Sequence, residues 1–362
     1  MNPEKQIQLK NNKGECLILR LREYRQGDEG GMIACIRDEY GDTYFKRGFY
    51  RSEYIKKQAE EGNITFLVAQ TMSGEIAGML ILKQFYPEEA MCEIASQIFR
   101  KKYRGWGLAM PFFEYGMEIL LSHSYSAAYC LPVAFHPITQ VLLYRLGLRA
   151  AGFVLNAFDM EKIVHSYQNG RNTKHSQAVQ IMPLGKKDAG MLYIPRKHQA
   201  FCRAVYESAK AAYQFAPEKK ICCVQEKIPE KSNISYINDE AQSSLEIRIY
   251  RAGRDLKQRI GAIHARFPLQ GKQTSNIFLN CSDPCAVWAY ECLENIRYFF
   301  TGLKPLCSEK EYIILHNPGE TVIYFEDYAV SDEFASLLYY VRACYEEQYK
   351  IKDNYKDSQV PQ

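Results

Sequence analysis

Two glycines beside an arginine carry the clearest chemical potential in the sequence: Arg104, Gly105 and Gly107 in "YRGWGLA" (103–109). The stretch lies between a predicted strand and an apolar run that predicts a helix. A turn in this position presents unpaired backbone N–H groups at the positive end of the helix dipole, and glycines let an anion approach the backbone closely. The stretch therefore predicts a phosphate site. The alternative is a helix start with a basic surface.

Other glycine loops that bind phosphate do not fit this chain. The sequence contains no G-x-x-x-x-G-K-[ST], which argues against a Walker loop, and no G-x-G-x-x-G, which argues against the dinucleotide-binding fingerprint.

The elements that must position this loop follow from hydrophobic periodicity. The first half predicts the order β α α β β β α β α β. Strands are expected at 17–24, 64–71, 75–85, 91–99, 126–135 and 150–158, and helices from Met32 and at 51–63, 107–123 and 138–147. The loop thus sits inside a strand–helix–strand unit, which typically forms a parallel strand pair with a crossover.

The second half predicts further helices and strands. Helices are expected at 196–215, 254–267, 283–300 and from about Asp332 to Lys350, and strands at 245–252, 275–281, 311–317 and 321–330. The stretches 136–154 and 283–306 share a pattern, because each begins with a polar residue and proline, continues as a helix and becomes a strand. This similarity suggests that the second half repeats part of the first.

Composition limits the class of protein. The chain has 362 residues, 24% of them charged, and a net charge of +4, which does not indicate a dedicated nucleic-acid binder. The N-terminus has no apolar signal region, and no run of 18 apolar residues predicts a membrane span, so we expect a soluble, cytoplasmic protein. The 12 cysteines follow no metal-ligand spacing, so we expect reduced, structural thiols and no metal.

The loop and its context resemble the GNAT (Gcn5-related N-acetyltransferase) superfamily. The family's pyrophosphate loop is R/Q-x-x-G-x-G/A, and residues 104–109 fit it in the common form R-G-x-G-x-A. About 40 residues on, "LLYRLGLRAAGF" is similar to the family's second motif, with Tyr144 in the tyrosine position. The Asn and Ala that often precede this tyrosine are Pro137 and Gln140 here.

Three other stretches resemble a poorly characterised bacterial subgroup of the family. They are "FHPITQ" (135–140), "RDEYGDTYF" (37–45) and "YIPRKHQAFCRAVYESA" (193–209). The resemblance implies an α/β (α+β) GNAT fold, with a mixed central sheet flanked by helices, in a catalytic domain at 1–165. A linker at 166–180 and a degenerate GNAT-like domain at 181–362, without a pyrophosphate loop, would follow.

The resemblance also implies a ligand, acyl-CoA, most simply acetyl-CoA, as co-substrate. Backbone N–H groups of Arg104, Gly105, Trp106, Gly107, Leu108 and Ala109 would bind its pyrophosphate. Gln97, Ile98 and Phe99 would lie beside the pantetheine arm, where a backbone N–H polarises the thioester carbonyl. Two parallel strands splay apart there in the family, and Pro132 would fit such a splay or simply end its strand.

Candidate catalytic residues follow from the same resemblance. Glu93 would take the proton of the attacking amine, and Tyr144 would protonate the leaving thiolate. The alternatives are a solvent-facing strand residue for Glu93 and a packed helix residue for Tyr144. Tyr40, Tyr44 and His136 are weaker candidates for contacting the acceptor. The alternative for the two tyrosines is a turn with packed aromatic residues, and a histidine before proline at a strand end is more often a helix cap or loop residue.

The expected function is therefore an acyl-CoA-dependent N-acyltransferase, an enzyme of the GNAT N-acetyltransferase type that acts on a primary amine of a small molecule or peptide. The alternative is a non-catalytic module that binds or senses acyl-CoA. We expect neither nucleic acid nor membrane as a partner, and the sequence leaves a homodimer open.

Overall fold

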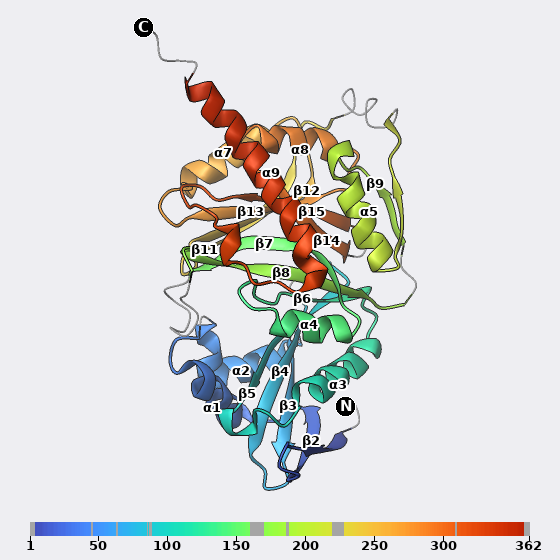
Figure 1. Ribbon diagram of the computed structural model, residues 1–362, viewed down its shortest axis with the longest axis vertical. Helices are drawn as coiled ribbons and strands as arrows, with labels where there is room; N and C mark the ends of the chain where they lie inside the picture. The colour runs from blue at the N-terminus through green and yellow to red at the C-terminus, as the bar shows by residue number, and fades with distance from the viewer. Residues whose placement is uncertain are drawn as a thin grey trace. The chain divides into compact units, whose positions relative to one another are not determined.

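In the computed structural model, the strands of the first half form one sheet with helices on both of its faces (Figure 1). The structure describes residues 4–357 except 45, 63, 85, 87–88, 160–169, 186–187, 219–227 and 308–309, and side chains as far as Tyr349. The chain divides into two compact units, which meet in the sequence between Cys130 and Leu131. The mixed α/β class expected from the sequence is confirmed.

Unit 1 holds a sheet in the order β1-β2-β3-β4-β5-β6, antiparallel except for the parallel β5–β6 pair. Its strands are β1 (Lys5–Lys10), β2 (Cys16–Glu23), β3 (Ile64–Thr71), β4 (Ile76–Lys83), β5 (Met91–Phe99) and β6 (Ala127–Cys130). Its helices are α1 (Glu29–Tyr40), η1 (Arg47–Tyr50), α2 (Ser52–Glu60), η2 (Lys101–Tyr103) and α3 (Ala109–Leu121).

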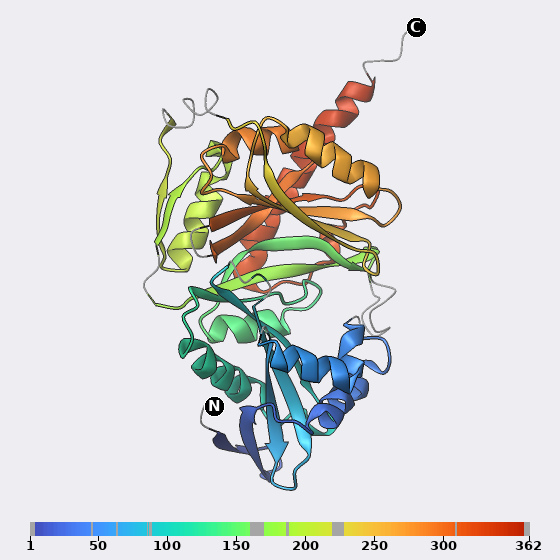
Figure 2. The same cartoon turned by 180° about the vertical axis from the view of Figure 1, so that it is seen from behind.

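Strand β4 is apolar along its length because both faces of this sheet are covered. Successive strand side chains point to opposite faces. Met79 and Ile81 pack in the cluster formed with α1 and α2. Leu80 instead lies next to Gly116 of α3, where a Cβ would come within 2.8 Å of it. The view from behind shows α1 and α2 in front of these strands, whereas α3 lies on the side seen in Figure 1 (Figure 2).

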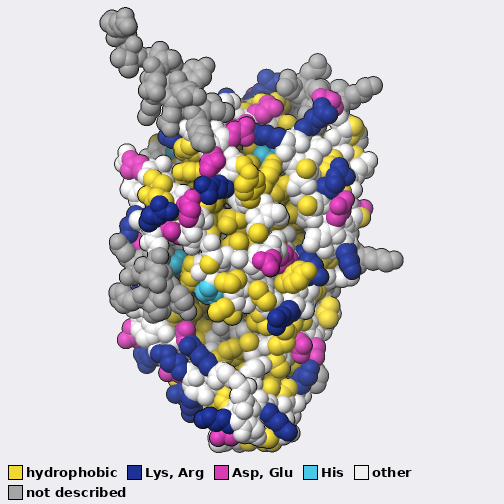
Figure 3. All heavy atoms as spheres, viewed as in Figure 1, with side chains coloured by type: hydrophobic (Ala, Val, Ile, Leu, Met, Phe, Trp, Pro, Cys, Tyr) yellow, Lys and Arg dark blue, Asp and Glu magenta, His cyan; other side chains and the backbone are white. Residues whose placement is uncertain are grey.

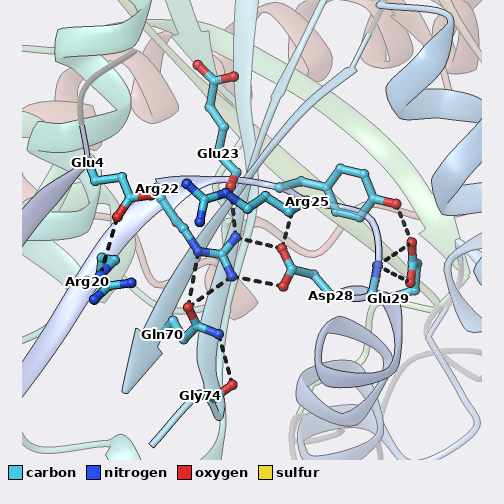
Figure 4. Close-up of polar contacts among 11 residues, drawn as sticks. Glu4, Arg20, Arg22, Glu23, Arg25, Asp28, Glu29, Gln70 and Gly74 are labelled. Carbon is cyan, nitrogen blue, oxygen red and sulfur yellow. Dashed lines mark hydrogen bonds and ion pairs between the residues drawn. The ribbon is translucent and has the colours of Figure 1, made fainter. Parts of the chain in front are cut away.

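A buried ion pair fixes the end of β2 to the start of α1 (Figure 4). The Arg22 guanidinium donates to both carboxylate oxygens of Asp28, at 2.7 and 2.9 Å, and also to Gln70 Oε1 on β3. Asp28 in turn accepts the backbone N–H of Arg25 at 2.7 Å. Because removing one partner would leave a buried charge, such a pair holds its elements firmly in place.

Unit 2 has its strands in the order β8-β7-β14-β15-β13-β12-β11, and the parallel pair β9–β10 forms a sheet of its own. Its strands are β7 (Arg149–Asp159), β8 (Lys174–Pro183), β9 (Asp188–Leu192), β10 (Ala212–Phe215), β11 (Asn233–Asp239), β12 (Ser244–Arg251), β13 (Thr274–Asn280), β14 (Phe299–Cys307) and β15 (Lys310–Asn317). Its helices are α4 (Ile138–Arg145), η5 (Arg196–His198), α5 (Gln199–Ser208), α7 (Leu256–Arg266), α8 (Ala286–Glu294), η7 (Phe325–Asp327) and α9 (Asp332–Asp357). Strand β8 begins at Lys174, inside the stretch expected to be a linker.

The order of elements repeats along the chain. Strand β5, helix α3 and the parallel strand β6 are followed by α4 and the antiparallel hairpin β7–β8. Strand β12, helix α7 and the parallel strand β13 are likewise followed by α8 and the antiparallel hairpin β14–β15. The two stretches with a shared sequence pattern contain α4–β7 and α8–β14, which hold equivalent places in this order.

Three expected elements of the second half are wrong in part. The helix expected at 196–215 ends at Ser208, and the chain then turns through Lys210, at φ +54°, to pair β10 with β9. The helix expected at 283–300 ends at Glu294, because the aromatic residues after it pair as β14 with β15. Residues 321–330 form no strand; Ile323 and Phe325 instead pack in a core with α9.

The structure also bears on the expectations for the cysteines and for membrane spans. The ten cysteines that the structure describes are free thiols, and eight of them are buried, as predicted. None of the described helices combines the length and the apolarity needed to cross a membrane.

Two glycines bring β7 and β14 into contact. Gly152 and Gly302 are the register pair of these strands and have φ values of +155° and +141°. A Cβ on Gly302 would lie 2.3 Å from the Gly152 Cα, and one on Gly152 would lie 2.5 Å from the Gly302 Cα. Because the obstructing atoms are backbone, neither position accommodates a side chain without moving a strand.

We expect Gly302→Ala to lower the free energy of unfolding by about 2–4 kcal/mol, because overpacking and a strained φ each cost about 1–3 kcal/mol. Urea denaturation followed by circular dichroism measures it. Gly261→Ala on α7 is the control: a Cβ there meets nothing within 4 Å, so the variant should gain about 0.5–1 kcal/mol. Equal stability of Gly302→Ala and wild type would contradict the close approach.

Candidate functional site

The candidate site lies where β5 loses its partner strand in unit 1. The parallel register of β5 and β6 ends with the pair Glu93↔Tyr129, and β6 stops at Cys130, two residues before Pro132. Strand β5 continues to Phe99, paired with β4 on its other edge. From Ala95 to Phe99, therefore, no described strand of unit 1 pairs with the β6-side edge of β5. An edge of this kind offers backbone N–H and C=O groups to a ligand.

A bulge lies in this unpaired part of β5. Ser96 has φ +50°, and the register between β4 and β5 shifts between Met79 and Ile81. Bulges redirect side chains near functional sites. Here Ser96 Oγ lies 2.8 Å from the Tyr44 hydroxyl and accepts a hydrogen bond from Lys46 Nζ at 3.1 Å. The bulge thus joins β5 to the segment between α1 and α2.

Two lysines lie close to Glu93, the candidate base. Glu93 is half-buried, and Lys83 is its cross-strand partner on β4. Burial lowers the pKa of Lys46 and of Lys83, and the Glu93 carboxylate acts in the opposite direction on both. Sequence analysis does not indicate Lys46, Lys83 or Ser96, because a bulge and a cross-strand neighbour leave no periodic pattern.

The two candidate tyrosines of this segment stack on each other. The ring centroids of Tyr40 and Tyr44 are 4.8 Å apart, and Tyr44 is buried. Burial raises the pKa of the Tyr44 hydroxyl, so this group stays neutral. Of the residues expected to contact the acceptor, the structure therefore places Tyr44 near Glu93 and Ser96. Tyr40 stacks on the ring of Tyr44.

The glycine loop leads from β5 into α3 with its backbone open. Gly105 and Gly107 have φ values of +80° and +74°, and a Cβ on either would meet nothing within 4 Å. Among the described residues, no acceptor takes the N–H groups of residues 105–109. Gln97 donates to the Ala109 carbonyl at 2.9 Å, which holds the start of α3 against β5. The loop therefore has the open donors that a phosphate site requires.

The side chains of the other predicted residues around the loop pack against neighbouring groups, and their role in binding stays a prediction. Ile98 packs in the core with α1 and α2, and the Phe99 and Phe112 rings lie 6.1 Å apart. Leu108 is buried and Trp106 is half-buried.

Carboxylates hold the basic run before the loop in place. Arg104 forms an ion pair with Glu39 of α1, and the backbone N–H of Lys101 donates to Asp38 at 2.6 Å. Arg100 and Lys102 both pair with Glu75. Lys and Arg side chains are visible on the surface around α1 (Figure 3). Because these partners offset much of the charge, backbone N–H groups would supply most of the specificity for an anion.

The equivalent loop of the second repeat, between β12 and α7, is closed. The N–H groups of Ala252, Gly253 and Arg254 donate to Asp283 Oδ2 at 2.7 Å, Ser232 Oγ at 2.9 Å and the Pro229 carbonyl at 2.8 Å. A Cβ on Gly253 would lie 2.4 Å from the carbonyl carbon of Lys231. Residues 229–232 thus cover the place that an anion would take, and the two loops differ sharply despite their equivalent positions.

Tyr144 and His136 belong to unit 2. Tyr144 lies on α4 with 47% of its surface exposed, and the Arg149 guanidinium lies 4.5 Å from its ring centroid. His136 is half-buried against Phe135, and His175 lies on the same phenyl ring, 4.2 Å between centroids. The role of Tyr144 opposite Glu93 stays a prediction.

No group of three or more potential metal ligands occurs among the residues that the structure describes.

Burial determines the protonation of the two histidines. Desolvation lowers the pKa of His136 and brings the pKa of His175 to about 4. We therefore expect both imidazoles to be neutral at pH 7.

In an NMR titration of the imidazole nitrogens, His175 should change near pH 4, far below its midpoint of about 6.5 in the urea-unfolded chain. Because the unfolded chain binds this proton first, the free energy of unfolding should fall as the pH drops from 6.5 towards 4. A folded-state midpoint near 6.5 would show that His175 is not desolvated.

Comparisons with known proteins give structural neighbours only. No protein-family model matches the sequence. No curated protein matches it either.

The structural neighbours cover 46% of the chain, in its N-terminal part. An N-acetyltransferase from Staphylococcus aureus Mu50 matches over 98% of its own length, with a TM-score of 0.38 and 12% identity. The dodecameric spermidine N-acetyltransferase of Vibrio cholerae matches over 94%, with a TM-score of 0.38 and 15% identity. A phosphinothricin acetyltransferase from Sinorhizobium meliloti, solved in complex with AcCoA, matches over 88%, with a TM-score of 0.37 and 16% identity. This last protein is described as a member of the GNAT superfamily, the family that residues 104–109 of this chain resemble.

Proposed function

We propose that this protein is an acyl-CoA-dependent N-acyltransferase of the GNAT type, which transfers an acetyl group to a primary amine. One observation carries the proposal. The backbone N–H groups of residues 105–109 lie open at the start of α3, directly after the strand whose edge is unpaired from Ala95 to Phe99. A phosphate-bearing ligand with an extended arm suits this combination of an anion site and a strand edge.

Binding would use the loop and the strand edge in turn. The N–H groups of residues 105–109 would hold the pyrophosphate of acetyl-CoA, and Gly105 and Gly107 leave room for its oxygens. The Arg104 N–H, also expected to take part, donates instead to the Lys101 carbonyl at 3.1 Å. Beyond the loop, the pantetheine arm would run along β5 past Phe99, Ile98 and Gln97. The AcCoA site would then end near Ser96, where the bulge lies.

The chemistry would take place at the end of the β5–β6 pairing. A backbone N–H of β5 would polarise the thioester carbonyl as the amine nitrogen attacks its carbon. Glu93, directly or through a water molecule, would take the proton that the amine loses. The carbon–sulfur bond breaks, and Tyr144 would donate a proton to the leaving thiolate.

The acceptor would enter beside the segment between α1 and α2. Tyr44, held by Ser96, is placed to contact it, and Tyr40 supports the Tyr44 ring. His136, if it takes part, would do so as a neutral imidazole. We also propose that residues 1–165 form the catalytic domain and that residues 181–362 form a GNAT-like domain in which residues 229–232 fill the place of a pyrophosphate loop.

Acetyl-CoA binding tests the loop. We expect calorimetry to show micromolar binding to wild type and no measurable binding to Gly107→Glu, because the new carboxylate would stand where the pyrophosphate lies. Gly74→Glu is the matched control. Its glycine also has a positive φ, +92°, and open space around it, but it lies in the β3–β4 turn. It should fold and bind acetyl-CoA as wild type does.

The proposal fails if folded wild type does not bind acetyl-CoA, since the glycine stretch would then be only a helix start. It also fails if Gly107→Glu and Gly74→Glu weaken binding equally, because strain and not position would then be the cause.

Turnover separates an enzyme from a binding module. With an amine found by screening amino acids, polyamines, peptide N-termini and aminoglycosides, we expect Glu93→Gln and Tyr144→Phe each to lower kcat about 10²–10⁴-fold, the usual contribution of general acid–base catalysis. Calorimetry should show that both variants still bind acetyl-CoA. Tyr125→Phe serves as the control for loss of a hydroxyl. Unchanged kcat in both variants would remove these residues from the mechanism, and absence of turnover with any amine would favour a binding module.

A further inference from the structure

A cavity of about 240 Å³ lies within unit 2, away from the glycine loop in the sequence and independent of the proposed transfer reaction. Its walls come from η5, from α8, from the start of β14 and from α9. The motif "YIPRKHQAFC" (193–202), for which acyl transfer gives no role, contributes Lys197 and His198. A pocket with several convergent polar groups is the usual form of a small-molecule site.

A fully bonded histidine forms the floor of the cavity. His198 is only 1% exposed, stacks on Phe300 and lies between two hydroxyls, with Nδ1 2.8 Å from Tyr340 and Nε2 2.7 Å from Tyr290. Burial lowers the pKa of His198 to about 3, so the ring is neutral. This floor is therefore rigid and uncharged.

The hydrogen bonds of this floor reach the Glu294 carboxylate. The Tyr340 hydroxyl donates to the Lys197 carbonyl at 2.7 Å and lies 2.8 Å from Nδ1 of His198. The Tyr290 hydroxyl lies 2.7 Å from Nε2 and also donates to Glu294 Oε1 at 3.3 Å. Glu294 therefore belongs to the same hydrogen-bond network as the histidine.

Negative charge outweighs positive charge around the cavity. Two carboxylates line it, Glu294 on α8 and Glu347 on α9, against one ammonium, that of Lys197. Lys197 Nζ lies 2.5 Å from Glu294 Oε1, which leaves the Glu347 charge as the excess. Burial raises the pKa of the Cys344 thiol to about 12, so this group adds no charge. The cavity therefore favours a cation.

Aromatic groups complete the lining. Tyr290 and Phe299 line the cavity, and Lys197 Nζ lies 5.5 Å from the centroid of the Tyr290 ring. A cation over an aromatic face is favourable, and an apolar body can pack on the same rings. From the carboxylates and these aromatic residues, we infer that the cavity binds a small organic ammonium compound with an apolar body.

Benzylamine is a suitable probe, because it joins one ammonium group to one ring, and benzoate and benzyl alcohol match its size without the positive charge. In calorimetry on the full chain without acyl-CoA, we expect benzylamine to bind and the other two to bind at least tenfold more weakly. Glu347→Gln should weaken benzylamine binding roughly twofold to fivefold, the upper part of the range for an exposed charge pair. Glu291→Gln, an exposed position of α8 outside the lining, is the control and should bind as wild type does.

Because benzylamine is itself a primary amine, its location needs a second variant. Cys344→Phe should fill the cavity and abolish binding, whereas Gly107→Glu should leave it unchanged. Three results would overturn the inference. Benzoate could bind as tightly as benzylamine, or no benzylamine binding could be detected. Alternatively, Glu347→Gln and Cys344→Phe could both bind benzylamine as wild type does while circular dichroism shows that they are folded. The acyl-CoA measurements are separate, so either proposal can fail alone.

Discussion

The early end of the β5–β6 pairing is the constraint on which the candidate site depends. Parallel strands normally pair along their shared length, but β6 is only four residues long and stops at Cys130, while β5 continues to Phe99. The short partner leaves a strand edge unpaired, the bulge at Ser96 turns its side chain towards Tyr44 and Lys46, and the remaining residues of β5 lead directly into the glycine loop. Glu93 lies at the last paired position and so marks the point where these features meet.

The two halves of the chain share one order of elements but differ in whether the loop before the helix is open or closed. Both contain a strand, a helix, a parallel strand, a second helix and a hairpin, and in both a short loop joins the first strand to its helix. In the first half the loop N–H groups have no acceptor among the described residues, whereas in the second half Ser232, Asp283 and the Pro229 carbonyl take them. A helix N-terminus requires partners for its N–H groups, and of these two loops only the second finds them among the described residues.

Elements with strong periodicity were predictable, and those decided by distant partners were not. Strands β2 to β5 and helices α3, α4 and α7 lie close to their expected ranges because local pattern and tertiary burial agree there. Strand β1 was not predicted, and the strand expected at 126–135 ends at Cys130. The stretch after Glu294 was expected to continue as a helix, but its aromatic residues gain more as β14, paired with β15 and packed under α9. Similarly, Lys46 and Ser96 carry no local signal, since their meeting depends on a bulge that forms only against β4.

Local sequence was enough to predict the glycine loop, its position between a strand and a helix, the mixed α/β class and the similarity between the two halves. These are local properties: residue type sets φ, and periodicity sets the element. The tertiary structure alone decided where β5 loses its partner, which carboxylates hold the basic run, why the second loop is closed, and that His198 and Glu347 line one cavity. Each of these joins residues far apart in the chain, and only folding brings them within the few ångströms over which hydrogen bonds and ion pairs act.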